Sequence, residues 1–173
     1  MFRQSFSLLL VGFVLILLSQ VLRPAAAAPA EEFSGRTVRV LDGDTIEALR
    51  SGSAVRIRLS GVDAPEKTQA FGMKAKEFTV GLAAGKTVVV KVRDVDRYGR
   101  LVAEVILPDG RSLNSEMVRS GFAWWYERYA PKDVRLARLE REARMAERGL
   151  WSDRRPQAPW EFRKAGRHGS RSR

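Results

Sequence analysis

The 173-residue sequence contains no cysteine and only one histidine. Without cysteine, the chain has no disulfide bonds, no thiol nucleophile and no thiolate ligand for a metal ion. Its fold must therefore be stabilised by its core alone. The single histidine, His168, lies in a basic segment near the C-terminus, where we expect no catalytic role.

Acidic residues are the scarcer charged class, with 20 Asp and Glu against 31 Lys and Arg and a formal net charge of +11. Removing residues 1–30 removes only Arg3 and Arg23 among the charged residues and leaves a formal charge of +9. Such an excess indicates a polyanionic partner, and nucleic acid, anionic lipid and a cell-surface polymer are all compatible with it. Charge alone does not choose among them.

The long apolar run of the chain lies near its N-terminus. Arg3 precedes an apolar stretch over residues 8–18, and small residues follow over 24–30. This order is typical of a signal peptide, and the run is shorter than the ~20 residues that span a bilayer. We therefore predict a signal peptide over residues 1–30 and an exported protein, periplasmic or secreted. An uncleaved membrane anchor is the alternative.

Residues 31–152 have the length and pattern of one compact domain. Apolar and polar residues alternate as in half-buried strands over residues 37–41, 45–49, 54–59, 87–93 and 101–107. Helices are expected over residues 69–83, 112–120 and 133–148. Five strands and about three packed helices predict an α+β fold, mainly β, for which a five-stranded barrel of the oligonucleotide/oligosaccharide-binding type fits best. Residues 153–173 are basic, and we expect a disordered tail.

Acidic residues and arginines gather where the expected strands end. Asp42-Gly43-Asp44-Thr45 lies between the first two strands, and Arg58 with Asp63-Ala64-Pro65-Glu66 closes the third. Arg100 ends the motif Asp96-Arg97-Tyr98-Gly99-Arg100. Each motif alone is more often a turn or a solvated charge. Together, carboxylates for a hard cation and arginines that donate paired hydrogen bonds to a phosphate favour metal-assisted cleavage of a phosphodiester.

Three segments resemble the thermonuclease, or staphylococcal-nuclease-like, family in order and spacing. They are Val40–Thr45, Arg56–Glu66 and Asp96–Arg100, and the similarity extends over about residues 35–152. The resemblance implies a barrel that acts as a Ca²⁺-dependent endonuclease on DNA and RNA. A noncatalytic nucleic-acid-binding module on the same barrel, or a cell-envelope protein held by its N-terminal helix, are the competing interpretations.

The resemblance also implies a role for individual residues. Two aspartates and a backbone carbonyl bind the metal ion, a glutamate acts as general base, two arginines hold the scissile phosphate, and basic and aromatic residues line the nucleotide site. The matching positions are Asp44, Asp63 and Ala64 for the metal, Arg58, Glu66 and Arg100 for catalysis, and Arg97, Tyr98 and Tyr129 for substrate binding.

Some positions depart from the family pattern or have an alternative interpretation. Ala64 stands where the best-known member has threonine, but a main-chain ligand makes this change mild. Glu127 stands where a tyrosine is expected, so the base preference is open. We expect Trp124 to be a packing residue and Trp160 to clamp the C-terminal segment.

Overall fold

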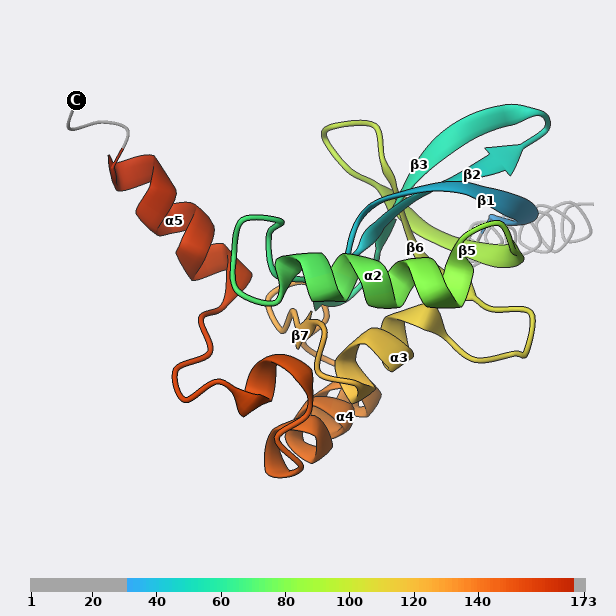
Figure 1. Cartoon of the computed structure of the whole chain (residues 1–173). Helices are drawn as coiled ribbons and strands as arrows, with labels where there is room; N and C mark the ends of the chain where they lie inside the picture. Colours follow the sequence, from blue (N-terminus) through green and yellow to red (C-terminus); the bar gives the residue numbers. More distant parts are fainter. Residues whose placement is uncertain (1–30, 170–173) are drawn as a thin grey trace, which may run out of the picture. The chain divides into compact units, whose positions relative to one another are not determined.

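The computed structural model describes residues 31–169 and shows a closed barrel of five strands (Figure 1). The predicted signal peptide lies outside the described residues. The strands are β1 (Glu32–Asp42), β2 (Thr45–Arg50), β3 (Ser53–Leu59), β5 (Thr87–Val95) and β6 (Leu101–Ile106). Their order around the barrel is β1-β2-β3-β6-β5, with β3 and β6 parallel and the other pairs antiparallel. The predicted five-stranded barrel of an α+β fold is confirmed.

The barrel closes around alternate, apolar side chains of its strands. Ile46 of β2 lies opposite Ile57 of β3, and both are fully buried. Val90 of β5 and Val105 of β6 form a second fully buried pair on the opposite part of the sheet. Closure leaves no unpaired edge among these strands, and the residues between the buried positions point outward. Functional side chains can therefore be presented on the outside of a rigid core.

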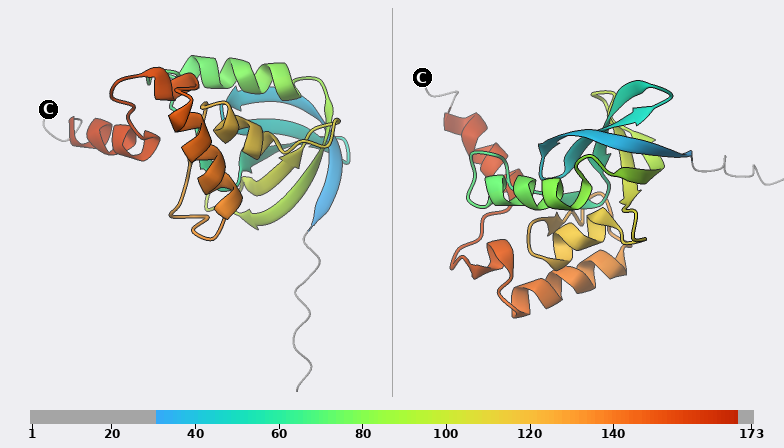
Figure 2. Two further views of the ribbon diagram at one scale, coloured as in Figure 1. Left: turned by 90° about the horizontal axis from the view of Figure 1, so that it is seen from below. Right: turned by 45° about the vertical axis from the view of Figure 1, so that its right-hand side comes forward.

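The helices of the described residues are α2 (Gly72–Ala83), α3 (Leu113–Arg119), α4 (Val134–Met145) and α5 (Pro159–Gly169), with a 3₁₀ turn, η1 (Gly149–Ser152). Helices α2, α3 and α4 gather on one side of the barrel, whereas α5 projects away from it (Figures 1 and 2). Helix α2 packs along β1, and α3 contacts both α2 and α4. Ser112 caps α3, because its hydroxyl accepts the amide N–H of Ser115. None of the helices within residues 31–169 is long and apolar enough to cross a bilayer.

A short two-stranded sheet brings Asp63 beside an aromatic cluster. It consists of β4 (Val62–Asp63) and β7 (Trp124–Trp125), which pair antiparallel with Asp63 opposite Trp124. Strands of two residues are too short to show alternation, so the sequence did not predict them. Trp124 packs against Trp151, with ring centroids 4.5 Å apart, as expected of a packing residue.

Helix α5 lies in the segment 153–173 for which the sequence analysis expects a disordered tail. Ala158 is buried at the start of the helix, and Trp160 stacks on Tyr126 with centroids 5.2 Å apart. Trp160 also meets Trp124 edge-on, with centroids 5.5 Å apart. Trp160 therefore clamps the C-terminal segment, as expected. These few apolar anchors hold a segment whose overall composition is that of a solvated tail.

A buried asparagine ties α3 to the barrel and to the turn before β4. The side-chain oxygen of Asn114 accepts the N–H of Val105, and its amide nitrogen donates to the carbonyl oxygens of Ser60 and Ala103 at 2.8 and 3.2 Å. Asn114 is 2% exposed, so its side-chain amide replaces water for the N–H of Val105 and the carbonyl oxygen of Ser60, whereas the carbonyl oxygen of Ala103 also accepts the N–H of Ser60 at 2.8 Å. Since Asp63 follows shortly after Ser60, this network also fixes the start of the acidic loop.

We expect Asn114→Ala to lower the free energy of unfolding by about 2–4 kcal/mol, because it leaves buried backbone groups unsatisfied. Ser115→Ala is the matched control in the same helix, since the buried Ser115 hydroxyl makes no hydrogen bond within the described part of the chain. That variant should stay within about 0.5 kcal/mol of the wild type. Urea unfolding followed by circular dichroism measures both. Equal losses in the two variants would contradict the assigned role of Asn114.

Candidate functional site

Two aspartates and one arginine form the centre of the candidate site. The pairing of β2 with β3 places Thr45 opposite Arg58, so Arg58 lies beside Asp44 at the start of β2. The Nη1 atom of Arg58 is 2.9 Å from Asp44 Oδ2, and Nη2 donates to Asp63 Oδ1 at 2.8 Å. Asp44 and Asp63 are 6% and 1% exposed. A single guanidinium thus holds two buried carboxylates together.

Backbone contacts fold the acidic loop onto β2. Asp44 Oδ2 accepts the amide N–H of Ala64 at 2.7 Å, and Oδ1 accepts the hydroxyl of Thr45. Nη1 of Arg58 also donates to the carbonyl oxygen of Val62 at 3.0 Å. Gly43 permits this close approach, because a Cβ added there would lie 2.8 Å from the Cβ of Ala64. The predicted metal residues Asp44, Asp63 and Ala64 are therefore neighbours in space.

The loop that carries Glu66 is held in shape by Gln69. The backbone N–H of Glu66 donates to the side-chain Oε1 of Gln69. The backbone N–H of Gln69 donates back to the carbonyl oxygen of Glu66 at 2.8 Å. The other end of the Gln69 side chain donates to the carbonyl oxygen of Gln157 at 2.7 Å. Gly72 is required where α2 begins, since a Cβ there would lie 1.8 Å from the Glu66 carbonyl oxygen. No sequence motif identified Gln69 as part of the site.

An arginine of α5 connects Glu66 to Asp63. Arg163 Nη1 donates to Glu66 Oε1, and Nη2 donates to Asp63 Oδ2, each at 2.7 Å. No sequence motif identified Arg163, which is 100 residues away from Asp63. One arginine among the many of the C-terminal segment carries no distinguishing pattern, so the sequence contains no signal for this contact.

Negative charge at this site is only partly compensated by its arginines. Burial raises the pKa of Asp63, an effect that the hydrogen bond from Arg163 and the charge of Arg58 oppose without cancelling. Burial also raises the pKa of Asp42, as do the charges of Asp44 and Glu66. The carboxylate of Asp42 accepts the amide N–H of Gly43, as in a turn. The cluster therefore favours the approach of a further positive charge.

The chemistry of these donors fits a hard divalent cation. Asp44, Asp63, Glu66 and the backbone at Ala64 offer oxygen atoms, which Ca²⁺ and Mg²⁺ prefer. Within residues 31–169, no group of three or more acidic, histidine or cysteine side chains is arranged to hold a metal ion. The carboxylates are instead oriented around the guanidinium groups of Arg58 and Arg163.

Arg100 directly precedes β6, the strand that neighbours that of Arg58, but its side chain has another partner. Leu101 of β6 pairs with Ile57 of β3, so Arg100 stands at the start of the neighbouring strand. Its Nε donates to Asp96 Oδ2 at 2.7 Å within a tight turn. In the described part of the chain, no hydrogen bond or ion pair joins Arg100 to the three carboxylates. The catalytic role assigned to it stays a prediction.

The predicted substrate-binding side chains are exposed. Tyr98 and Tyr129 are 68% and 70% exposed, and Arg97 donates to the hydroxyl of Tyr98. Tyr129 packs edge-on against Tyr126, which in turn stacks on Trp160 of α5. An aromatic row therefore connects a predicted substrate-binding residue to the C-terminal helix.

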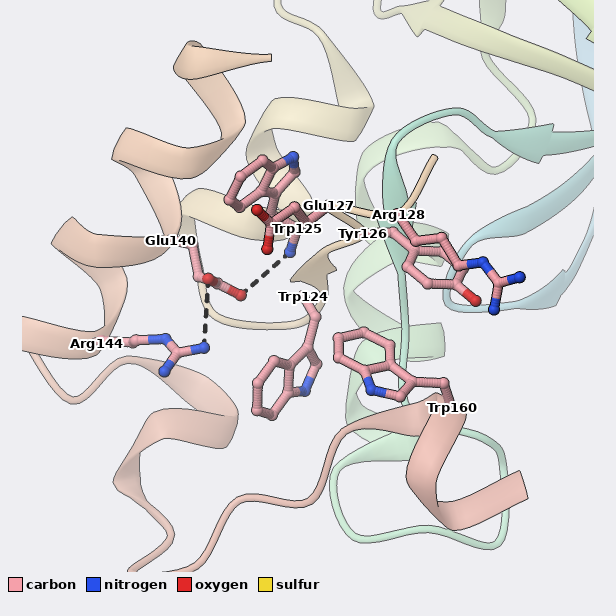
Figure 3. A pocket seen from close by; sticks show the side chains of 8 residues that line it. All are labelled: Trp124, Trp125, Tyr126, Glu127, Arg128, Glu140, Arg144 and Trp160. Carbon is pink, nitrogen blue, oxygen red and sulfur yellow. Dashed lines mark hydrogen bonds and ion pairs between the residues drawn. The ribbon is translucent and has the colours of Figure 1, made fainter. Parts of the chain in front are cut away.

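A cavity of about 360 Å³ lies between this row and α4 (Figure 3). Figure 3 shows Trp160 reaching from α5 toward Trp124 and Tyr126 on its rim. On the opposite wall, Glu140 accepts the amide N–H of Trp125 and pairs with Arg144. Because these charges are already paired and the rings pack on one another, the cavity wall mainly supports the aromatic cluster beneath α5.

Comparisons with known proteins find similar sequences among nucleases. Residues 56–153 match the sequence profile of the family described as Staphylococcal nuclease homologue. The chain is 52% identical over 132 residues to a protein of Escherichia coli O157:H7 named an uncharacterized endonuclease, covering 76% of this chain and 86% of that protein. It is 40% identical over 146 residues to a micrococcal nuclease of Shigella flexneri, covering 79% and 84% of the two chains. It is also 38% identical over 172 residues to Protein ParB of Escherichia coli, covering 94% of each.

The turn that holds Arg100 gives a prediction for stability against pH. Partial burial raises the pKa of Asp96, but hydrogen bonds from the amide and side chain of Arg100 outweigh this and leave the pKa below its ordinary value of 3.8. A lowered carboxyl pKa stabilises the fold above the unfolded-state pKa, and this contribution is lost as the pH falls through the folded-state pKa. Asp96→Asn keeps the turn acceptor but removes the charge.

We therefore expect Asp96→Asn to lower the free energy of unfolding at pH 7 by about 0.5–1 kcal/mol. The difference from the wild type should shrink as the pH is lowered below about 3.8. Asp94→Asn is the control two residues earlier, near the end of β5, since the exposed carboxylate of Asp94 accepts the amide N–H of its neighbour Val95. Thermal unfolding at several pH values measures the difference, and a pH-independent loss would rule out the charge as its cause.

Proposed function

Because the chain belongs to the staphylococcal nuclease homologue family, and is thereby an endonuclease acting on nucleic acid, we propose that it is an exported, Ca²⁺-dependent enzyme that hydrolyses phosphodiester bonds of DNA and RNA. The observation that carries the proposal is the pair of buried carboxylates, Asp44 and Asp63, held around Arg58 with Glu66 beside them. This arrangement offers oxygen ligands, a phosphate-binding guanidinium and a carboxylate base within one small site.

The acidic residues supply the metal ligands. Asp44, Asp63 and the carbonyl of Ala64 would hold the cation, and a bound Ca²⁺ draws negative charge from a phosphate oxygen. The burial of Asp63 supports this role, because a carboxylate removed from water gains most from a cation that binds it directly.

The arginines supply a directional positive charge for the phosphate. Attack on a phosphodiester builds negative charge on the phosphoryl oxygens, and planar guanidinium groups stabilise it through paired hydrogen bonds. Arg58 already lies at the carboxylates, and Arg100 begins the adjoining strand with a side chain that is 29% exposed. We assign Arg58 to the nonbridging oxygens and Arg100 to the leaving oxygen.

Glu66 is the carboxylate best placed to act on water. Its side chain is 33% exposed, whereas that of Asp63 is 1% exposed, so water reaches Glu66 directly. Glu66 would accept a proton while the water oxygen forms a bond to phosphorus and the bond from phosphorus to the leaving oxygen breaks. The leaving oxygen then takes up a proton. General-base assistance of this kind contributes ~10²–10⁴-fold.

The surface around the site suits a flexible nucleic acid of either sugar. The net charge of +11 favours a polyanion, and Tyr98 and Tyr129 are exposed for stacking against bases. Stacking tolerates any base and both sugars, which supports action on DNA as well as RNA. Export is supported by the pattern of residues 1–30, and the N-terminus of the protein recovered from cells tests it.

We expect Glu66→Gln to reduce kcat by about 10²–10⁴-fold, because it removes the proton acceptor and keeps the size of the side chain. The assay is release of acid-soluble nucleotides from single-stranded DNA, and from RNA, with Ca²⁺ or with a chelator. Glu142→Gln is the control on α4, where the side chain is 41% exposed. Hydrolysis that persists in chelator would overturn the metal requirement. Binding of DNA without hydrolysis by the wild type would favour the noncatalytic module.

Arg58→Lys tests the geometry of the guanidinium at constant charge. A lysine lacks the two-pronged donor that reaches both Asp44 and Asp63, so we expect kcat to fall about 10²-fold or more. Arg56→Lys is the matched control two residues earlier on β3, where Arg56 pairs with Glu47. The two variants are compared at saturating Ca²⁺ and DNA. Equal activity of both would mean that charge alone is sufficient at residue 58.

A further inference from the structure

Arg163 is the residue of the site for which the proposed reaction has no role. Its guanidinium spans Asp63 and Glu66, the most buried aspartate and the proposed base, at 2.7 Å from each. A third contact of 3.3 Å joins Nη1 to the other oxygen of Asp63. Both oxygens of Asp63 and one of Glu66 are therefore engaged by a side chain that comes from outside the barrel and its acidic loop.

The position of Arg163 excludes a metal ion on the same oxygens. A Ca²⁺ ion lies 2.3–2.6 Å from its oxygen ligands. The guanidinium nitrogens occupy nearly this position relative to Asp63 and Glu66, so the two cations would overlap and repel each other. Either the guanidinium or the divalent ion binds these carboxylates at one time.

Helix α5 is held so that Arg163 reaches the carboxylates. Trp160 stacks on Tyr126 and meets Trp124 edge-on, which fixes the first turn of the helix. Arg163 follows three residues later, on the same face of the helix as Trp160. The hydrogen bond from Gln69 to the carbonyl of Gln157 ties the approach to α5 directly to the Glu66 loop.

We propose that α5 is a built-in inhibitory segment, in which Arg163 occupies the cation position on Asp63 and Glu66 and must leave before a divalent metal ion binds. The proposal rests on the proposed function, since it concerns the metal site of that enzyme. The charge-assisted hydrogen bonds of Arg163 are strong enough to compete with a metal ion for the carboxylates. Because the Arg163 side chain is 35% exposed, water can solvate the guanidinium when it is displaced.

Competition, not loss of a proton, is the mode of release. Burial tends to lower the pKa of Arg163, but its hydrogen bonds to Asp63 and Glu66 outweigh burial and raise the pKa above its ordinary value. Arg163 is thus always charged, and it leaves only when another cation takes the carboxylate oxygens. The wild type should therefore need a higher Ca²⁺ concentration for half-maximal activity than a chain without this guanidinium.

The test measures Ca²⁺ binding to the mature protein by isothermal titration calorimetry. We expect Arg163→Ala to bind Ca²⁺ at least about tenfold more tightly than the wild type, the effect of removing one charge-assisted competitor. Lys164→Ala is the matched control, because it removes the same charge from an exposed neighbour on α5 and should stay within about twofold. Trp160→Ala, which releases the helix without touching a carboxylate, should shift the affinity in the same direction as Arg163→Ala.

A second readout is the melting temperature with and without Ca²⁺. Arg163→Ala should melt lower than the wild type without Ca²⁺ and gain more from its addition, because its carboxylates then lack one counter-charge. An unchanged or weaker Ca²⁺ affinity in Arg163→Ala would overturn the inhibitory role. If kcat at saturating Ca²⁺ also fell in that variant, Arg163 would be a substrate-binding residue.

The outcomes separate this inference from the proposed function. Wild-type hydrolysis that needs Ca²⁺, with equal affinities in wild type and Arg163→Ala, refutes the inhibitory segment alone. Tighter Ca²⁺ binding by Arg163→Ala without hydrolysis by any variant supports the segment and refutes the nuclease proposal. Absence of Ca²⁺ binding in both proteins refutes both.

Discussion

The ion pairs of Arg58 with Asp44 and Asp63 are the interaction on which the site depends. Two carboxylates that are 6% and 1% exposed cannot stay ionised side by side without a positive charge between them. The strand pairing of β2 with β3 supplies that charge by setting Arg58 next to Asp44. The short β4–β7 pairing then fixes Asp63 on the other side of the guanidinium. The barrel thus serves as a rigid support for a charged arrangement that short peptides could not hold.

Part of this arrangement could be predicted from the sequence. Alternation located the five barrel strands, and the order of the motifs brought Asp44, Arg58 and Asp63 together, as the structure confirms. The alternation of apolar and polar residues predicts these strands because each strand has one face in the core and the other toward solvent. The family resemblance was needed to assign a function to these residues, because turns and solvated charges have the same local sequence patterns as metal ligands.

The rest required the three-dimensional structure. Arg163 meets Asp63 across 100 residues, and nothing in its neighbourhood distinguishes it from the other arginines. The basic composition of residues 153–173 suggested disorder, whereas a few apolar anchors such as Ala158 and Trp160 are sufficient to dock α5. The composition of a segment is an average over all its residues, whereas the docking of α5 depends on a few side chains that pack against the rest of the domain. The same limit hid Gln69, whose hydrogen bonds connect two distant loops.

The charges also explain why a strongly basic protein keeps an acidic site. A buried carboxylate cluster requires a positive partner in every state of the enzyme, whether the partner is a metal ion or an arginine. In the structure Arg58 serves the inner pair, and Arg163 serves the outer pair of Asp63 and Glu66. Arg58 comes from a barrel strand and cannot leave, whereas Arg163 comes from a helix held by a few contacts at its start, chiefly those of Ala158 and Trp160. The outer pair is therefore the half of the cluster where one cation can be exchanged for another without disturbing the fold.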